Sequence, residues 1–375
     1  MSYRYGASYL DPGLNTLVAP TGTLVYNLYS WGANNQGQLG LGNTTSYSSP
    51  KQISASTYWL TAAGGYQFYL ALNTNSSLWS WGNNQYGNLG LGNTTFYSSP
   101  KQVGSLTNWQ SISGGYYHSF GIKTDGTLWA WGRNNVGQLG LSNTVSVSSP
   151  VQVGALTNWK TISAGLDFSI AVKTDGTLWV WGSNGSGQLG LGNTTYYSSP
   201  KQVGALTNWS SISADKGGST SVAIKTNGTI WAWGKNYFGQ LGLGNTTYYS
   251  SPKQIGALTT WTQVSSYSQT TIALKTDGTL WSWGLNNYGQ LALNNTTNYS
   301  SPKQVGSLTI WKSILFGGCG SGIQTNGTLW TWGYNGNGQL GIGNTTTQSS
   351  PVQVGNLTTW SGLAGAGNST LGIIY

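Results

Sequence analysis

Apolar residues alternate with a period of two in the most regular segments of the chain. In Leu178-Trp179-Val180-Trp181, the two tryptophans fall on one side of an extended strand, and Leu178 and Val180 fall on the other. Because both sides are apolar, the pattern predicts a strand packed between two layers. No apolar stripe with a helical period continues beyond one turn. The pattern therefore predicts an all-β protein.

A Trp-Gly dipeptide marks a repeat that runs along nearly the whole chain. It occurs at Trp31, Trp81, Trp131, Trp181, Trp233, Trp283 and Trp332, at intervals of 49 to 52 residues. A period of this length, with about four strand-like segments per copy, is typical of a propeller blade. The chain is predicted to be a seven-bladed β-propeller.

Two of the strands in each copy are joined by a short turn. The turn residues are Asp125-Gly126, Asp175-Gly176, Asn227-Gly228, Asp277-Gly278 and Asn326-Gly327, with Asn75-Ser76 as a variant. Asp-Gly or Asn-Gly between two apolar runs predicts a two-residue type I′ turn, in which both central residues have positive φ.

All 20 tryptophans occupy repeated positions. Seven belong to Trp-Gly, and the others begin a strand (Trp59, Trp109, Trp159, Trp209, Trp261, Trp311, Trp360) or precede Trp-Gly by two residues (Trp79, Trp129, Trp179, Trp231, Trp281, Trp330). Large rings at equivalent positions of every copy favour a role in packing neighbouring blades. A ligand-binding or light-absorbing cluster is the alternative for a few of them.

The two ends of the chain complement each other. Ser369 to Ile374 align with the strand that precedes the turn in other copies, and the chain stops before the turn itself. The missing half is supplied by Thr21 to Leu24 and Leu28 to Gly32. We expect N-terminal and C-terminal strands to share the last blade, which removes an exposed sheet edge. Residues 21–375 then form one propeller, and residues 1–20 form an arm whose Tyr3, Arg4, Tyr5 and Tyr9 are candidates for docking.

The repeat resembles a known type of propeller. Trp-Gly-x-Asn-x-x-Gly-Gln-Leu-Gly-Leu-Gly, followed by Ser-Pro and by Lys-Thr-Asp-Gly-Thr-Leu-Trp, is similar to the regulator-of-chromosome-condensation repeat over about residues 21–375. The resemblance implies a seven-bladed ring, often closed by both termini, that binds proteins on one face. Members include exchange factors for a small GTPase, chromatin binders, plant photoreceptors and bacterial inhibitors of β-lactamase. No long insertion corresponds to the wedge of the exchange factors, so exchange activity is not favoured.

The composition leaves little room for catalysis. There are six aspartates, no glutamate, one histidine and one cysteine. Three aspartates fall in turns, which leaves Asp11, Asp167 and Asp215 for an acid pair, and His118 alone for a Ser-His-acid arrangement. His or Cys clusters for a metal are absent, and the Gly-rich runs lack the Lys-Ser/Thr and helix that hold phosphate. We expect no enzyme activity, no metal, no cofactor and no membrane span.

Lysines recur at two repeat positions and give the chain a net charge of +9. One set follows Ser-Pro (Lys51, Lys101, Lys201, Lys253, Lys303), and the other precedes the turn (Lys123, Lys173, Lys225, Lys275). Each set is expected to form a circle of positive charge. The circles serve solubility, or they bind an acidic protein face, a polyanionic glycan or nucleic acid. Sequence-specific reading of nucleic acid is not expected, because no dense basic cluster occurs.

Aromatic residues gather before Ser-Ser-Pro: Tyr47, Phe96, Tyr97, Tyr196, Tyr197, Tyr248, Tyr249 and Tyr299. They either pack between blade edges or form a recognition surface, because tyrosine gives rigid contact area at low entropic cost. The copies differ most after Trp-Gly and before the strand that leads into the turn. Variation that is confined to loops on a copied scaffold is typical of a binding surface.

Three functions remain open. The first is a non-enzymatic structural or recognition component of a larger assembly, such as a phage decoration, tail or fibre protein, which the low charge and abundant Asn, Thr, Ser, Gly and Tyr favour. The alternatives are a soluble protein-binding regulator or inhibitor and a glycan-binding lectin. Without a signal-peptide pattern, the sequence favours a virion or the cytoplasm over classical secretion.

Overall fold

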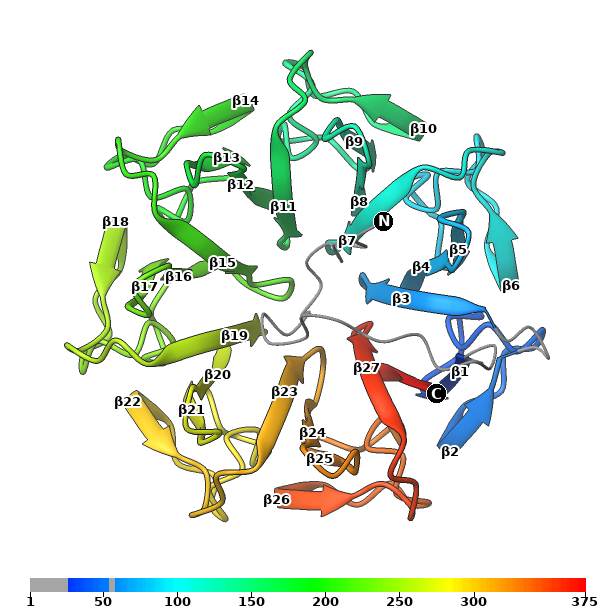
Figure 1. Ribbon diagram of the computed structural model, residues 1–375, viewed down its shortest axis with the longest axis vertical. Helices are drawn as coiled ribbons and strands as arrows, with labels where there is room; N and C mark the ends of the chain where they lie inside the picture. Colours follow the sequence, from blue (N-terminus) through cyan, green and yellow to red (C-terminus); the bar gives the residue numbers. More distant parts are fainter. Residues whose placement is uncertain (1–25, 54–57) are drawn as a thin grey trace, which may run out of the picture.

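Seven four-stranded antiparallel sheets are arranged as blades around a central axis (Figure 1). The computed structural model describes residues 26–53 and 58–375. The described residues contain no helix, and thus none long and apolar enough to cross a lipid bilayer. The all-β, seven-bladed prediction is confirmed.

Each blade has an innermost, a second, a third and an outermost strand. The innermost strands are β3 (Trp59–Gly64), β7 (Trp109–Gly114), β11 (Trp159–Ala164), β15 (Trp209–Ala214), β19 (Trp261–Tyr267), β23 (Trp311–Phe316) and β27 (Trp360–Gly365). The second strands are β4 (Phe68–Asn73), β8 (His118–Lys123), β12 (Phe168–Lys173), β16 (Thr220–Lys225), β20 (Thr270–Lys275), β24 (Gly320–Gln324) and β28 (Ser369–Ile374). The third strands, which carry Trp-Gly, are β5 (Leu78–Gly82), β9 (Leu128–Gly132), β13 (Leu178–Gly182), β17 (Ile230–Gly234), β21 (Leu280–Gly284), β25 (Leu329–Gly333) and β1 (Asn27–Gly32). The outermost strands are β6 (Tyr97–Gln102), β10 (Val147–Gln152), β14 (Tyr197–Gln202), β18 (Tyr249–Gln254), β22 (Tyr299–Gln304), β26 (Gln348–Gln353) and β2 (Tyr47–Gln52).

Both ends of the chain meet in one blade, as predicted. Its strand order is β2-β1-β28-β27, and β1 pairs with β28 from Asn27 opposite Ile374 to Gly32 opposite Ser369. Pairing strands from the two ends closes the ring without an open sheet edge at the junction. The predicted contribution of Thr21 to Leu24, and the arm with Tyr3, Arg4, Tyr5 and Tyr9, lie outside the described residues.

The turn between the second and third strands differs from the predicted type I′ turn. Gly126 has φ of +77°, whereas Asp125 is not among the residues with positive φ. Gly126 N–H donates to Lys123 O, and Lys123 N–H donates to Thr127 O. This is the three-residue hairpin loop, a type I turn closed by a left-handed glycine. Asp125 instead stabilises the turn through its side chain, because its Oδ1 accepts hydrogen bonds from the backbone N–H and the hydroxyl of Thr127.

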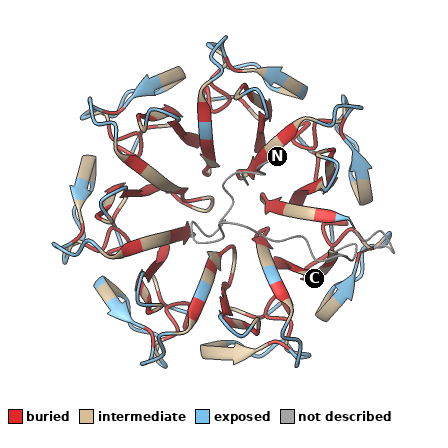
Figure 2. Ribbon diagram, in the orientation of Figure 1, coloured by how far each residue is buried: buried red, intermediate tan, exposed pale blue. Residues whose placement is uncertain are grey.

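The tryptophans pack blade against blade, as expected. All seven Trp-Gly rings are fully buried, and each donates its indole N–H to a carbonyl of the preceding blade; Trp131 Nε1, for example, lies 2.9 Å from Asn88 O. The innermost-strand ring of the same blade meets it edge to face, with 6.0 Å between the centroids of Trp109 and Trp131. Burial is concentrated in the three inner strands of each blade, and the outermost strands are half-buried or exposed (Figure 2).

The outermost strand of each blade is a sheet edge, and the sequence protects it. Every one carries the proline of Ser-Ser-Pro in its interior, which withholds a backbone donor from an incoming strand. The loop after Trp-Gly of the preceding blade also covers it, for example through Gly92 N–H donating to Ser148 O. The ring is thus guarded against edge-to-edge association.

Candidate functional site

The predicted tyrosine and lysine circles form pairs on the outermost strands, which we call the rim. Lysine Nζ lies 5.3–5.6 Å from the centroid of a tyrosine ring in five pairs: Lys51 with Tyr47, Lys101 with Tyr97, Lys201 with Tyr197, Lys253 with Tyr249 and Lys303 with Tyr299. At this distance the ammonium and the ring attract each other. The five tyrosines are half-buried along their strands, while the lysines are exposed.

The other predicted aromatic residues are more exposed. Phe96, Tyr196 and Tyr248 precede the rim strands and are 43–50% exposed. By contrast, Tyr97, Tyr197 and Tyr249 pack against apolar cores of their blades. The predicted aromatic circle therefore divides into a packed set and an exposed set.

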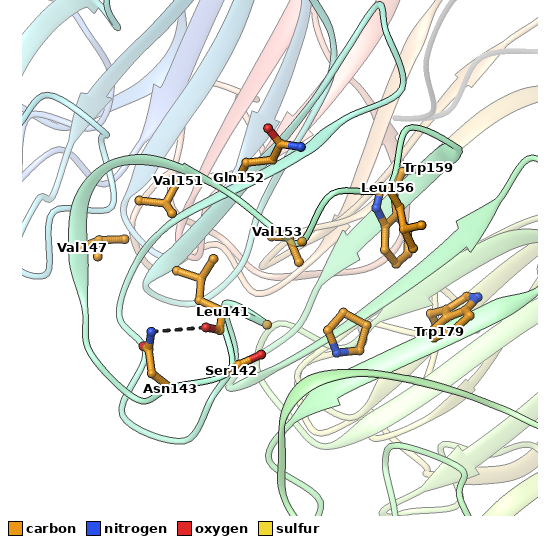
Figure 3. A pocket seen from close by; sticks show the side chains of 13 residues that line it. Leu141, Ser142, Asn143, Val147, Val151, Gln152, Val153, Leu156, Trp159 and Trp179 are labelled. Atoms are coloured by element: carbon orange, nitrogen blue, oxygen red, sulfur yellow. Dashed lines mark hydrogen bonds between the residues drawn. The ribbon is translucent and has the colours of Figure 1, made fainter.

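Two rim strands lack the pair, and one of them borders a hollow of about 500 Å³. Strand β10 carries Val147 and Val151 where five other copies carry Tyr and Lys. These side chains line the hollow together with Leu156, Trp159 and Trp179 (Figure 3). No ionisable side chain lines it, so the hollow offers apolar contact without acid–base groups.

The second lysine set does not form the expected surface circle. Lys123, Lys173, Lys225 and Lys275 are only 5–8% exposed. Each lies between two tryptophans, with Nζ 3.6–3.8 Å from the centroid of one ring and 4.7–5.1 Å from the other. Removal from water lowers the pKa of these ammonium groups. These lysines are part of the blade packing.

The two segments in which the copies differ most lie at the same end of every blade. One joins the innermost to the second strand, and the other follows Trp-Gly; in an antiparallel sheet both connections come out on one side, which we call the loop face. Backbone hydrogen bonds join the two segments in six blades, from N–H to C=O: Ala33 to Asn368, Asn83 to Gln67, Arg133 to Tyr117, Ser183 to Asp167, Lys235 to Ser219 and Leu285 to Gln269. The fold therefore gathers the variation onto one surface. The opposite end, with the hairpin turns and the blade-to-blade connections, is called the turn face.

Four tyrosines from two adjacent blades touch on the loop face and form what we call the tyrosine cluster. Tyr66 stacks on Tyr116 with 4.2 Å between centroids and 10° between planes. Tyr117 meets Tyr66, Tyr116 and Tyr86 at 5.7, 4.6 and 4.9 Å. All four are half-buried, and desolvation raises the pKa of Tyr116 and Tyr117. The phenols of Tyr116 and Tyr117 therefore remain neutral donors and acceptors at physiological pH.

Arg133 connects the tyrosine cluster to a third blade. Its guanidinium carbon lies 5.3 Å from the centroid of the Tyr86 ring, and its Nη1 lies 3.5 Å from Asp167 Oδ1. Asp167 Oδ1 also accepts a hydrogen bond from Gln138 Nε2 at 3.2 Å. Burial raises the pKa of Asp167, while Arg133 opposes that rise. Both charged side chains are 26% exposed, so the pair lies at the surface.

The blade of β15–β18 sends a side chain across the axis. Its loop-face connection is two residues longer than in most copies and contains Asp215 and Lys216. Lys216 Nζ donates to Gly64 O at the end of β3 at 2.6 Å, and desolvation lowers the pKa of Lys216 to about 8. Strands β15 and β3 lie on opposite sides of the axis (Figure 1). The carboxylate of Asp215 accepts hydrogen bonds from the backbone N–H of Gly217, Ser268 and Gln269. Burial nevertheless raises its pKa to about 6.

The remaining candidates for chemistry are enclosed. His118 is fully buried with Nε2 3.1 Å from Ser169 Oγ, and desolvation lowers its pKa to about 3. Cys319 is buried, and desolvation raises the pKa of its thiol. In the part of the chain that the structure describes, no three His, Cys, Asp or Glu side chains gather in a metal-binding arrangement.

Comparison with known families agrees with this architecture. The sequence profile described as the RCC1-like domain matches residues 23–259, well over half of the chain. The chain belongs to the regulator of chromosome condensation (RCC1) family. Profiles of the RCC1 repeat itself match residues 261–290, 277–321 and 326–373, so RCC1-type sequence extends almost to the C-terminus.

Solved RCC1-type propellers share the fold at low sequence identity. Prp20p from Saccharomyces cerevisiae is 19% identical with a TM-score of 0.83, covering 94% of this chain and 92% of that one. Human WBSCR16 is 20% identical with a TM-score of 0.82, covering 93% and 98%. A further structure, Kap60 bound to yeast RCC1 (Prp20), gives 18% identity and a TM-score of 0.85, covering 94% and 89%. No curated protein sequence matches the chain.

The tyrosine cluster and Arg133 were not among the residues singled out from the sequence. Their signal was the variation between copies, which marked both segments without showing that they meet. The rim residues, selected for their aromatic and positive character, lie on copied strands. The fold thus separates the regular rim from the irregular loop face.

Proposed function

We propose that the chain is a protein-binding regulator of the RCC1 family whose partner docks on the loop face. The convergence of the two variable segments on that face carries the proposal. A surface that differs from blade to blade, on a scaffold that does not, is suited to one asymmetric partner. Its exposed aromatic side chains include Tyr237 at 64% and Tyr288 at 53%, and tyrosine is enriched at protein interfaces.

The structural comparisons support binding as the general activity. Prp20p binds Gsp1p and histones, and yeast RCC1 (Prp20) has been solved with Kap60 bound to it. Protein binding is the property we carry over, and none of these partners is assigned to this chain. The comparisons lend no support to the virion component that composition favoured.

Binding also accounts for the ionisable groups better than catalysis does. Asp125, Asp175 and Asp277 are engaged in hairpin turns, Asp167 with Arg133, and Asp215 with backbone N–H groups. His118 is enclosed and neutral above its lowered pKa. We infer a non-catalytic regulator.

Site-specific photo-cross-linking tests the docking face. A photoreactive p-benzoylphenylalanine is placed at Tyr237 on the loop face, at Leu206 on the turn face or at Lys201 on the rim, all exposed. Each protein is irradiated in a lysate of the source cells. We expect a discrete cross-linked protein through position 237 alone. Cross-links confined to position 206 or 201, or none at 237, contradict the proposal.

A further inference from the structure

We infer that Arg133 and the tyrosine cluster form the anchor point of the loop face, and that this point takes an acidic segment of a partner protein. The inference rests on the proposed function, because it names where and by what chemistry the partner is held. The six side chains concerned are Tyr66, Tyr86, Tyr116, Tyr117, Arg133 and Asp167, and they come from three consecutive blades.

The cluster is organised before any partner arrives. Each tyrosine ring is in contact with at least one other ring of the cluster, and Tyr117 contacts three. The connections that carry the rings are tied together by the backbone bonds from Asn83 to Gln67 and from Arg133 to Tyr117. A partner that binds here therefore loses little side-chain entropy on the propeller's side, which favours affinity.

Most hydrogen-bond donors of the Arg133 guanidinium have no acceptor among the described residues. A guanidinium carries five N–H donors in a planar fork that suits a carboxylate. Among the described residues, Asp167 Oδ1 is its acceptor, through a single long contact of 3.5 Å. The Tyr86 ring supports the guanidinium on one side. The group is thus positioned but incompletely paired, as expected of a site for a second carboxylate.

The charge of the loop face favours an acidic partner. Arg133 and Lys235 lie in loop-face segments, and Lys216 lies nearer the axis. The carboxylates described there are Asp167, which is already paired, and Asp215, which is fully buried. Complementarity of this kind steers association and fixes orientation. A neutral sugar is less suited, because Tyr66 and Tyr116 stack on each other and do not present both of their faces.

A displayed library of short random peptides, selected on the full chain, provides the probe. We expect the selected peptides to be enriched in Asp and Glu. Affinity of a synthetic selected peptide is then measured by fluorescence anisotropy at low and high salt. Arg133→Gln, and separately Tyr117→Ala, are expected to weaken binding by about tenfold. Asp167→Asn is expected to strengthen binding about threefold, because it removes the internal competitor for the guanidinium.

Leu206→Ser serves as the control, since it removes an exposed apolar side chain from the turn face. Tyr237→Ser reports on the loop face outside the cluster, and melting curves verify that every variant is folded. Peptides without acidic enrichment, or acidic peptides that bind Arg133→Gln as tightly as wild type, overturn the inference. If binding is lost in Tyr237→Ser but not in Arg133→Gln, the loop face stands and the anchor is wrong. If no loop-face variant changes binding, the proposed function fails as well.

Discussion

On the turn face the blades with a hairpin turn present nearly the same features, whereas on the loop face the blades differ in the residues just after Trp-Gly and just before the second strand. Half-exposed leucines recur on the turn face at Leu106, Leu156, Leu206, Leu258, Leu308 and Leu357, all 45–51% exposed. The hairpin turns there repeat a chain of hydrogen bonds, such as Trp179 Nε1 to Thr177 Oγ1 and Thr177 Oγ1 to Asp175 Oδ1. The loop face has instead a tyrosine cluster in one region and an axial lysine in another.

This contrast indicates that copied positions maintain the ring, while uncopied positions are free to acquire function. A copied residue performs the same packing task seven times, so a change there damages an interface between blades. An uncopied loop-face residue belongs to one local arrangement. The comparison therefore predicts a steep contrast in stability effects between the two kinds of position.

The largest effect is expected in the copied core. Trp131→Ala removes a fully buried ring and its hydrogen bond to Asn88 O, and should lower the free energy of unfolding by roughly 3–5 kcal/mol. Tyr237→Ser on the loop face should change it by less than about 0.5 kcal/mol. Chemical denaturation of both variants measures the contrast. Similar losses of unfolding free energy in the two variants would contradict this contrast between copied and uncopied positions.

Much of this division was visible in the sequence, and some was not. The Trp-Gly period and the complementary chain ends were sufficient for seven blades and their closure. The burial of Lys173 was missed, because a charged residue in a strand is expected to face water until Trp159 and Trp179 are brought to its two sides. Tyr66 and Tyr117 lie far apart in the chain, and only the placement of neighbouring blades makes them touch.

Asp215 lies on the loop face, but we expect it to affect stability, and the pH dependence of the melting temperature tests this. Its pKa is raised from 3.8 to about 6, so it contributes stability that is present below about pH 4 and lost as pH rises through about 6. The rise corresponds to about 3 kcal/mol at most. The melting temperature of wild type relative to Asp215→Asn should therefore fall between about pH 4 and pH 7.

The comparison with Asp215→Asn is needed because His118 has the opposite slope. Its lowered pKa gives stability that is present above its ordinary value of 6.5 and lost as pH falls toward about 3. His118→Gln should remove that part of the acid sensitivity. A wild-type minus Asp215→Asn difference that does not vary with pH would show that the carboxyl group is not held as described.

A smaller effect is expected where one copy has drifted from the repeat. Ala292 has φ of +59° at a position where Gly242 has +72°, and a Cβ at Gly242 would lie 2.8 Å from Trp283 Nε1. Ala292→Gly should raise the free energy of unfolding by about 1 kcal/mol, since it relieves a left-handed alanine. Gly242→Ala is the matched reverse change and should be destabilising. A destabilising Ala292→Gly together with a stabilising Gly242→Ala would contradict the account.

The central claim is that the ring's stability and its recognition of a partner reside in different residues. The most direct measurement uses one variant with Tyr66→Ser, Tyr86→Ser, Tyr117→Ser, Arg133→Ser and Tyr237→Ser, and the protein that cross-links through position 237. Its affinity for the variant is measured, with the melting temperature as the check on folding. The account predicts a ring that still melts in one cooperative transition and no longer binds. Binding retained at wild-type strength by the folded variant would contradict it.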